Sequence, residues 1–370
     1  MPFNLLIDPF LPVVTRSGAA RMIRFAELSQ TEGDYAPIEF DWPRPDFNIA
    51  SYEFCIGIFA LALSMESEAN WRNLWHMPPS VGELDEALAP IVHAFNLDGD
   101  GPRFMQDFDE LDGEANAIEA LLIDTPGING QKKNADLLTH RERYAAIGLP
   151  TAGMALYAMQ QFAPSGGAGN RTSMRGGGPL TTLIMPGAQD DQTVALWHKI
   201  LANLSVVPQE ANIGAGLQKA LPWLAKTLVS DKAGGEDMLH GQDERVHGLQ
   251  ACFGMPRRVR LVFSSETGVC PMTGANGALV SGFVQKPWGM NYGLWVHPLT
   301  PYRRQKEESE PYSVKPKSGR FGYRDWVSVT FGSEDGKLAQ PSGNIRSAGG
   351  NRANRLCHGH FFGSPQKRAG

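Results

Sequence analysis

Cysteine is scarce in this 370-residue sequence, and no two cysteines form a C-x-x-C pair. The four residues are Cys55, Cys252, Cys270 and Cys357, which lie far apart along the chain. This spacing favours neither a zinc site nor a disulfide framework. We therefore expect a protein without a bound metal or other cofactor that works in the reducing cytoplasm.

Long apolar runs are also few. Residues 47–65, FNIASYEFCIGIFALALSM, form the most apolar segment, but it contains Asn48, Ser51, Tyr52 and Glu53. A membrane span needs about 20 mainly apolar residues, so a buried helix is the better interpretation. The start of the chain, MPFNLLIDPFLPVV, lacks the basic residues and the cleavage site of a signal peptide. We expect no association with a membrane.

The common catalytic motifs are absent as well. The sequence has no G-x-S-x-G nucleophile motif and no H-E-x-x-H zinc motif. His297 follows apolar residues in LWVHPLTPY, a context that favours a packed histidine over a catalytic base. These absences favour a protein that is not an enzyme.

Glycine, in contrast, is concentrated in one segment. Residues 165–182, SGGAGNRTSMRGGGPLTT, contain six glycines and two arginines. The segment lacks the lysine of the phosphate-binding motif G-x-x-x-x-G-K-[ST], and Thr172 replaces the third glycine of the dinucleotide motif G-x-G-x-x-G. Two interpretations of this glycine loop (165–178) remain: an ordinary flexible surface loop, or a loop that lies against a polymer backbone or groove. A phosphate- or nucleotide-binding enzyme that uses the loop is the alternative function.

Charge is unevenly distributed along the chain. The formal net charge is −5, which argues against a surface that is basic all over but allows a local basic patch. The stretch 107–124 is acidic, whereas the chain after Asp335 carries lysines and arginines and no acidic residue. The segment 127–144, called the basic loop below, combines turn residues with basic side chains. Long loops of this kind inside compact domains are usually functional or disordered.

Patterning predicts an α+β fold. Helices are expected at 47–65, 84–97 and 191–204, and in 84–97 the apolar residues recur at helical spacing. Strands are expected in NLLID, PFLPVV and MIRFAEL near the start of the chain, and at 257–263, 278–285 and 325–331. We divide the chain into a large mixed N-terminal part with long functional loops (1–230), a β-rich second part (231–340) and an irregular basic tail (341–370). A soft linker is expected around residues 230–244.

Four stretches together resemble one family, CasA, the large subunit of the type I-E CRISPR surveillance complex called Cascade. NLLIDPFLPV is similar to the N-terminal signature of that family, and APSGGAGNRTSMRGGGPLTT resembles its glycine loop. FVQKPWGMNYGLWVHPLTP resembles its lysine-bearing strand and the turn that follows. The basic loop, around NADLLTHRERY, lies where the family has an extended loop that reaches into the rest of the complex. The motifs appear in the family's order over about residues 4–332.

The resemblance implies a non-catalytic subunit that recognises the protospacer-adjacent motif in double-stranded DNA. It also implies that the protein promotes strand opening and helps recruit the helicase-nuclease of antiviral defence. This division of labour is physically reasonable, because the guide RNA reads the target by base pairing. The implied partners are the other Cascade subunits, the guide RNA, the target DNA and the helicase-nuclease.

The resemblance also implies two sets of site residues. By this resemblance, the glycine backbone is expected to approach the minor groove, and Lys286 is expected to donate to acceptors there. The DNA-binding set is Gly166, Gly167, Ala168, Gly169, Asn170, Arg171, Lys286 and Arg355. The set for complex assembly and guide RNA contact is Lys132, Lys133, Leu138, His140, Arg141 and Arg143. For Arg171 and Arg175, phosphate contact and pairing within the protein remain equally open.

The chain departs from the family pattern in two places. Some members bind zinc through several cysteines near residues 264–277, but only Cys270 is present here, so no metal is implied. The family continues into a C-terminal four-helix bundle, which we expect to be absent from this chain. Arg355, in GGNRANR, falls where the family places a glutamine wedge between base pairs.

Overall fold

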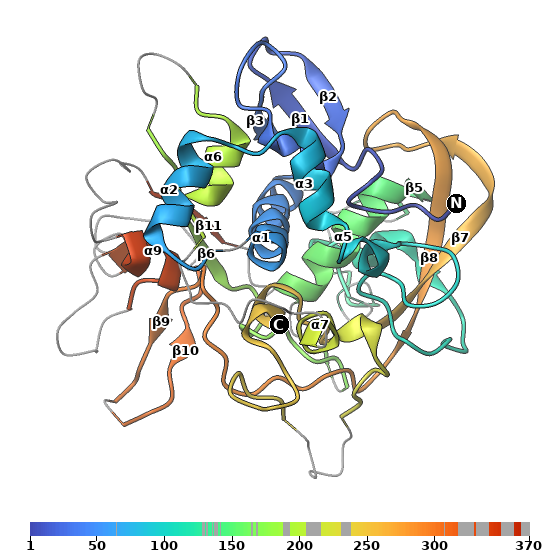
Figure 1. The fold of residues 1–370 in the computed structure, drawn as a ribbon. Coiled ribbons are helices and arrows are strands. Elements are labelled where there is room, and N and C mark those ends of the chain that lie inside the picture. Colours follow the sequence, from blue (N-terminus) through green and yellow to red (C-terminus); the bar gives the residue numbers. More distant parts are fainter. Residues whose placement is uncertain are drawn as a thin grey trace.

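Two largely buried helices, α1 (Pro45–Ala62) and α5 (Leu149–Phe162), pack against each other at the centre of the fold (Figure 1). Their side chains are mainly apolar around the whole circumference, which is typical of a helix enclosed on all sides. Pro45 and Pro150 lie in the first helical turns, where a missing N–H costs no intrahelical hydrogen bond. Helices α1 and α5 therefore form the centre of the hydrophobic core.

The computed structural model describes all residues other than 64, 128–129, 131, 135, 137–139, 141, 164–165, 168, 188–192, 205–215, 231–237, 307, 317–328, 331–339, 349–358 and 364–370. Shorter α-helices are α2 (Glu68–His76), α3 (Val81–Leu88), α6 (Leu196–Leu201), α7 (Leu217–Ala220) and α9 (Gly343–Ala348). The 3₁₀ helices are η1 (Phe25–Ser29), η2 (Val92–Phe95), η3 (Ile118–Leu121), η5 (Pro222–Leu224) and η6 (Gly248–Cys252). Within this described part, no helix is long and apolar enough to cross a membrane.

The described strands pair in antiparallel groups around the two central helices (Figure 1). The longest pair joins β7 (Arg258–Val269) to β8 (Asn276–Lys286), and β8 also pairs with the short β4 (Asn116–Ala117) and β5 (Ile147–Gly148). A second sheet places β1 (Leu11–Thr15) between β2 (Ala20–Ile23) and β3 (Pro37–Phe40). The remaining pairs are β9 (Tyr302–Arg303) with β10 (Tyr312–Ser313), and β6 (Leu180–Ile184) with β11 (Gly359–Gly363).

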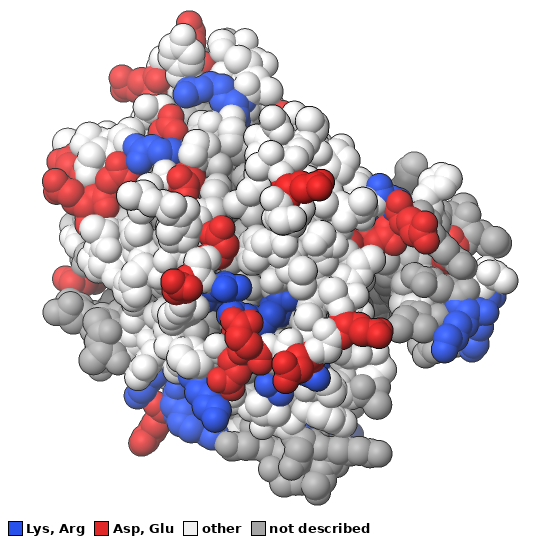
Figure 2. Space-filling view, turned by 90° about the vertical axis from the view of Figure 1, so that its right-hand side faces the viewer, with Lys and Arg blue, Asp and Glu red and all other residues white. Residues whose placement is uncertain are grey.

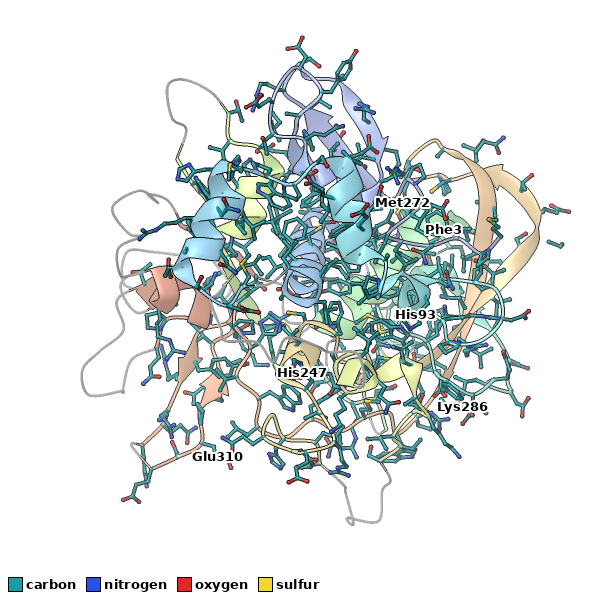
Figure 3. All side chains as sticks on the ribbon, viewed as in Figure 1. Phe3, His93, His247, Met272, Lys286 and Glu310 are labelled. Carbon is teal, nitrogen blue, oxygen red and sulfur yellow. The ribbon has the colours of Figure 1, made fainter. Side chains whose placement is uncertain are left out.

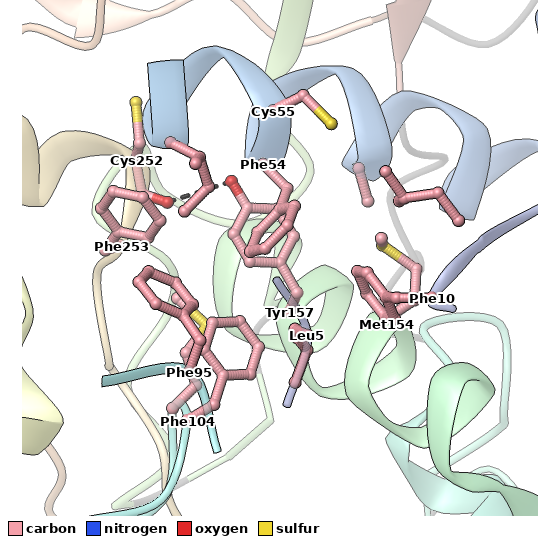
Figure 4. Close-up of a cluster of buried hydrophobic side chains, with 14 of the residues drawn as sticks. Leu5, Phe10, Phe54, Cys55, Phe95, Phe104, Met154, Tyr157, Cys252 and Phe253 are labelled. Carbon is pink, nitrogen blue, oxygen red and sulfur yellow. Dashed lines mark hydrogen bonds between the residues drawn. The ribbon is translucent and has the colours of Figure 1, made fainter. Parts of the chain in front are cut away.

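An aromatic cluster fills the space between the two central helices and the N-terminal segment (Figure 4). Phe54 makes edge-to-face contacts with Phe10, Phe95 and Tyr157 at centroid distances of 5.6, 6.1 and 5.4 Å. Such contacts add directional stabilisation to the burial of apolar area. The Tyr157 hydroxyl donates to the carbonyl of Cys252 at 3.0 Å, so this buried polar group is satisfied.

The α+β fold class predicted from the sequence is confirmed. Helix α1 coincides with the helix expected at 47–65, and α6 is the described part of the helix expected at 191–204. Strand β7 includes the segment expected at 257–263 except Arg257, and β8 includes the segment expected at 278–285. Length and apolar content predicted these elements, although β7 and β8 are buried over only part of their course.

Three local predictions near the start of the chain are wrong. NLLID forms a turn rather than a strand, because the Asn4 side chain accepts from the Leu6 N–H at 3.0 Å. The helix expected at 84–97 ends at Leu88, shortly before Pro90, and continues only as η2. MIRFAEL contains only the end of β2 and then η1, in which Glu27 accepts from the Arg24 N–H at 2.8 Å. Patterning also did not predict helices α2 and α5.

The later part of the chain differs from expectation as well. Where residues 230–244 are described, they are not a soft linker, because Leu239 is buried and donates to the carbonyl of Asn291 at 2.9 Å. The strand expected at 325–331 lies mostly outside the described residues, and Val329 and Thr330 are helical. The tail expected to be irregular contains α9 and β11, since the edge of β6 offers backbone groups for pairing.

The three-part division at residues 230 and 340 stays a prediction. One hydrophobic cluster includes Leu5, Phe54, Tyr157, Phe283 and Leu299, which come from both of the first two parts. The elements that carry the glycine loop and Lys286 are therefore supported by the same core.

Candidate nucleic-acid interface

The structure brings the glycine loop against the turn that follows β8. The Trp288 N–H donates to the carbonyl of Gly169 at 2.8 Å. The Gln285 side chain donates through Nε2 to Oδ1 of Asn170 at 2.6 Å. Two segments that the sequence separates by more than a hundred residues thus lie side by side, and Lys286 lies between the two residues that make these bonds.

Two glycines in this loop have positive φ but different surroundings. Gly169 is buried with φ +80°, and a Cβ there would lie 2.7 Å from Cβ of Pro287. Gly167 has φ +89° but is exposed, and a Cβ there would meet nothing within 4 Å. Gly169 therefore allows the close approach of two backbones, whereas Gly167 serves the turn alone.

Asn170 closes the loop on itself. Its N–H donates to the carbonyl of Gly167 at 3.1 Å, and its side chain donates through Nδ2 to the carbonyl of Gly166 at 2.8 Å. Below Gly166 lies the guanidinium of Arg257, whose Nη1 would be 3.0 Å from a Cβ at that glycine. Burial lowers the pKa of Arg257 to about 10, so it remains a cation at neutral pH beneath an exposed loop.

Lys286 ends strand β8 at the outer margin of the molecule (Figure 3). It is half-buried and pairs in register with Arg258 of β7. Its Nζ would lie 3.8 Å from a Cβ placed at Gly113, so the ammonium lies over the acidic stretch. The neighbouring Asp112 and Glu114 are both exposed. The lysine is thus positioned by a strand but remains accessible to a ligand.

The two neighbouring arginines of β7 are paired with acids. Arg258 Nε lies 2.6 Å from a carboxylate oxygen of the fully buried Asp107. Arg260 donates to the Asp107 carbonyl at 3.1 Å and forms an ion pair with Glu110. Figure 2 shows Lys and Arg side chains interspersed with Asp and Glu on the side of the molecule that carries β7 and β8. The side of the molecule that carries β7 and β8 is therefore not basic overall, and positive charge there is confined to single side chains.

Arg171 and Arg175 differ in their surroundings. Arg171 is half-buried, with its guanidinium 5.3 Å from the ring centroid of Trp288 and its Nε donating to Oγ of Ser230 at 2.9 Å. Arg175 is 3% exposed and forms a 2.7 Å ion pair with the fully buried Glu53. Arg175 therefore pairs within the protein, whereas Arg171 stays at the edge of the loop.

The C-terminal end of the basic loop is anchored to acidic residues. Glu119 accepts from the backbone N–H groups of Glu142 and Arg143 at 3.0 and 2.7 Å. Arg143 also lies 3.0 Å from Asp124. Burial tends to raise the pKa of Asp124, but hydrogen bonds from Arg143 and Arg44 hold it below its usual value. Arg143 thus fixes the loop to the acidic stretch.

The other predicted members of the basic loop are at the surface or undescribed. Lys132, Lys133 and His140 are exposed, and Leu138 and Arg141 lie outside the described residues. Of the DNA-binding set, Ala168 and Arg355 also lie outside them. The structure therefore brings Gly166, Gly167, Gly169, Asn170 and Arg171 together against the turn that follows Lys286, whose own ammonium lies near Gly113.

His297 is a packed histidine, as its sequence context predicts. It is fully buried, and its Nδ1 accepts from the Leu299 N–H at 3.1 Å. Burial, with a smaller contribution from the Arg175 charge, holds the pKa of His297 well below its usual value. Across the described part of the chain, no three His, Cys, Asp or Glu residues are arranged to hold a metal ion.

Two residues at this edge lie outside the predicted site sets, although the sequence indicated that Pro287 and Trp288 form a fixed turn beside Lys286. Trp288 has φ +63°, an uncommon conformation for a residue other than glycine, and Ser230 lies buried against it. The signal for Trp288 was its place between Pro287 and Gly289, where a bulky residue is confined to a tight turn. Nothing near Ser230 in the sequence indicates its contacts, because both lie about 60 residues away.

Comparison with known families identifies the chain. A family model described as CRISPR-associated protein Cse1 matches residues 4–363. The chain belongs to the Cse1 family. The resemblance to CasA is thereby confirmed, because solved structures named both CasA and Cse1 share the fold. The match also includes the glycine loop and the β8 turn, which the structure places together.

Solved Cse1 structures show the same fold at low sequence identity. CasA from Thermus thermophilus superposes with a TM-score of 0.64 at 17% identity, over 94% of this chain and 64% of that protein. Cse1 from Acidimicrobium ferrooxidans gives 0.63 at 17% identity, over 98% and 70%. A chain of a structure titled "CRISPR RNA-guided surveillance complex" gives 0.65 at 14% identity, over 99% and 76%. The chain thus spans just under two thirds of the Thermus protein's length.

Proposed function

We propose that this chain acts as the large, non-catalytic subunit of an RNA-guided surveillance complex and recognises a short motif in double-stranded DNA. Membership of the Cse1 family and the fold shared with a chain of a surveillance complex support this role. The proposed partners are the other Cascade subunits, the guide RNA, the target DNA and a helicase-nuclease. Reading of the motif then starts strand opening, and the helicase-nuclease is recruited afterwards.

The observation that carries the proposal is the contact between the glycine loop and the Lys286 turn. The Trp288 N–H to Gly169 carbonyl bond of 2.8 Å holds the loop with the exposed Gly166 and Gly167 against the turn that directly follows Lys286. Bare backbone fits a narrow groove, and a lysine reaches acceptors on its floor. The minor groove offers these acceptors at every base pair, so we expect a degenerate motif preference.

Local charge compensation fits recognition of a motif better than general DNA binding. Arg258 and Arg260 lie near Lys286 on the paired strands β7 and β8. Both form ion pairs, Arg258 with Asp107 and Arg260 with Glu110. Fewer cations available for phosphates mean a smaller salt-dependent contribution that is independent of sequence. The remaining affinity then depends more strongly on contacts to base edges.

The exposed lysines of the basic loop are proposed to contact the guide RNA or another subunit. Lys132 and Lys133 are exposed, while Arg143 is bound to Asp124. We therefore assign assembly to the exposed members of the loop and anchoring to Arg143. A segment that is ordered on binding suits this role.

A phosphate-binding enzyme is the weaker candidate. Phosphate loops lie at helix N-termini, where backbone N–H groups and the helix dipole attract anions. Here the glycine loop follows the C-terminal end of α5 and leads into β6. The helix end before this loop is the one that disfavours a phosphate group.

The experiment is a motif selection with the assembled complex. A duplex library is randomised beside a fixed target sequence, and bound duplexes are sequenced for the wild-type chain, for Lys286→Ala and for the control Lys306→Ala. Lys306 is an exposed lysine in the β9–β10 connection. We expect Lys286→Ala to reduce motif enrichment about tenfold. Equal enrichment by Lys286→Ala and Lys306→Ala contradicts the proposal. A melting temperature that rises with ATP or NAD but not with a motif-bearing duplex supports the enzyme instead.

A further inference from the structure

Ser230 touches both segments of the candidate interface from a third part of the chain. It is 4% exposed, and its Oγ accepts from Nε of Arg171 at 2.9 Å. The same hydroxyl donates to the carbonyl of Gly289 at 2.7 Å. A single side chain therefore joins the glycine loop to the turn after Lys286.

The turn that Ser230 holds is conformationally unfavourable. Trp288 has φ +63°, and its N–H donates to the Gly169 carbonyl at 2.8 Å while its carbonyl accepts from the Ser230 N–H at 3.1 Å. A residue other than glycine persists in this region only where its surroundings determine it. The guanidinium of Arg171, 5.3 Å from the indole centroid, completes these surroundings.

The segment that carries Ser230 is itself anchored. Thr227 is 5% exposed, and its Oγ1 accepts from the Phe108 N–H at 3.0 Å. Phe108 adjoins Asp107, which binds Arg258, the residue opposite Lys286. Hydrogen bonds thus connect one end of residues 227–230 to the acidic stretch beside Arg258, and the other end to the turn after Lys286.

We propose that Ser230 is a positioning residue that sets the spacing between the glycine loop and Lys286, and thereby the discrimination between motifs. The inference rests on the proposed function. Reading a motif requires the loop and the lysine to engage neighbouring base pairs at the same time, so their relative position must be fixed before binding. Without the hydroxyl, the loop and the lysine engage separately, while the total charge that attracts phosphates is unchanged.

The test is Ser230→Ala in the assembled complex, with the same randomised duplex library. The control is Ser29→Ala, a serine that is 5% exposed and donates to the Ala26 carbonyl at 3.0 Å in η1. We expect Ser230→Ala to lower motif enrichment about five- to tenfold, because one of its bonds is to a charged donor. Affinity for a scrambled duplex and its salt dependence stay within about twofold, and Ser29→Ala leaves enrichment unchanged.

Lys286→Ala in the same assay separates failure of this inference from failure of the proposed function. If Lys286→Ala loses enrichment and Ser230→Ala does not, the positioning role is wrong. If Lys286→Ala keeps its enrichment, the site assignment itself is wrong. If Ser230→Ala does not assemble, Ser230→Cys decides, because it nearly keeps the side-chain size but replaces the hydroxyl by a weak donor and acceptor. A Ser230→Cys variant with full enrichment overturns the inference, and one with the same loss upholds it.

Discussion

The glycine loop and the basic loop are both rich in residues that suit nucleic-acid binding, but they are bound to different parts of the protein. The glycine loop is bound to a distant turn through Gly169, Asn170 and Arg171. In the basic loop, Glu142 and Arg143 at its C-terminal end are bound to nearby acidic residues, Glu119 and Asp124. A motif reader needs fixed geometry before binding, whereas a contact for assembly gains its order from the partner.

The largest expected effect concerns the two glycines of positive φ. Gly169→Ala places a Cβ 2.7 Å from Pro287 and separates the loop from the Lys286 turn, whereas Gly167→Ala has only the backbone strain. We expect more than about a tenfold loss of motif enrichment for Gly169→Ala, and a clearly smaller loss for Gly167→Ala. Motif selection with both variants measures this difference. Equal losses would show that the contact with Pro287 is irrelevant to reading.

The next effect is on assembly. Lys132→Glu combined with Lys133→Glu reverses two exposed charges in the basic loop, so we expect about tenfold less incorporation into the complex and an unchanged melting temperature. Co-purification with tagged subunits and guide RNA measures incorporation. Reversal of Lys306 is the control. Normal incorporation of the double variant would show that these two charges do not contribute to assembly.

The anchor of the basic loop should matter for stability instead. Glu119 is 7% exposed, and Glu119→Gln turns one of the two acceptors for Glu142 and Arg143 into an amide donor. We expect a loss of about 1–3 kcal/mol in the free energy of unfolding, measured by urea denaturation, with no change in motif enrichment. A loss of enrichment without a loss of stability would contradict the separation between the two regions.

A smaller effect concerns the buried His297. Because burial holds the pKa of His297 well below 6.5, the unfolded chain binds one more proton than the folded chain below that pH. Stability should therefore fall as pH decreases below 6.5, by up to about 1.4 kcal/mol per pH unit from this group. His297→Gln should flatten the profile between about pH 6.5 and pH 5. Identical profiles for the two proteins would show that His297 takes up no proton on unfolding.

The sequence predicted elements whose signal is local. Helix α1 and strands β7 and β8 are long and apolar enough to be recognised on their own. Helix α5 was not predicted, because small residues such as Gly153 and the absence of a polar face leave no helical periodicity in its sequence. Turn chemistry at Asn4 and the proline after Leu88 likewise changed elements that apolar content alone predicted.

The candidate site could be predicted only in pieces. Composition revealed the glycine loop, and family resemblance added Lys286, but no local pattern reveals the bond between Gly169 and Trp288. Arg175 was ambiguous for the same reason, because its partner Glu53 lies 122 residues away in the sequence. Contacts of this range are determined by the packing of the whole core, which periodicity does not report.

Base substitution in the DNA tests the central claim most directly. Inosine paired with cytosine keeps the major-groove face of a G·C pair but lacks the guanine amino group in the minor groove, as an A·T pair does. At each motif position found by selection, binding of the assembled complex to G·C, I·C and A·T duplexes is compared for wild type and Lys286→Ala. The account predicts that I·C behaves like A·T for wild type and that Lys286→Ala reduces the difference from G·C. Behaviour of I·C like G·C would contradict reading through the minor groove.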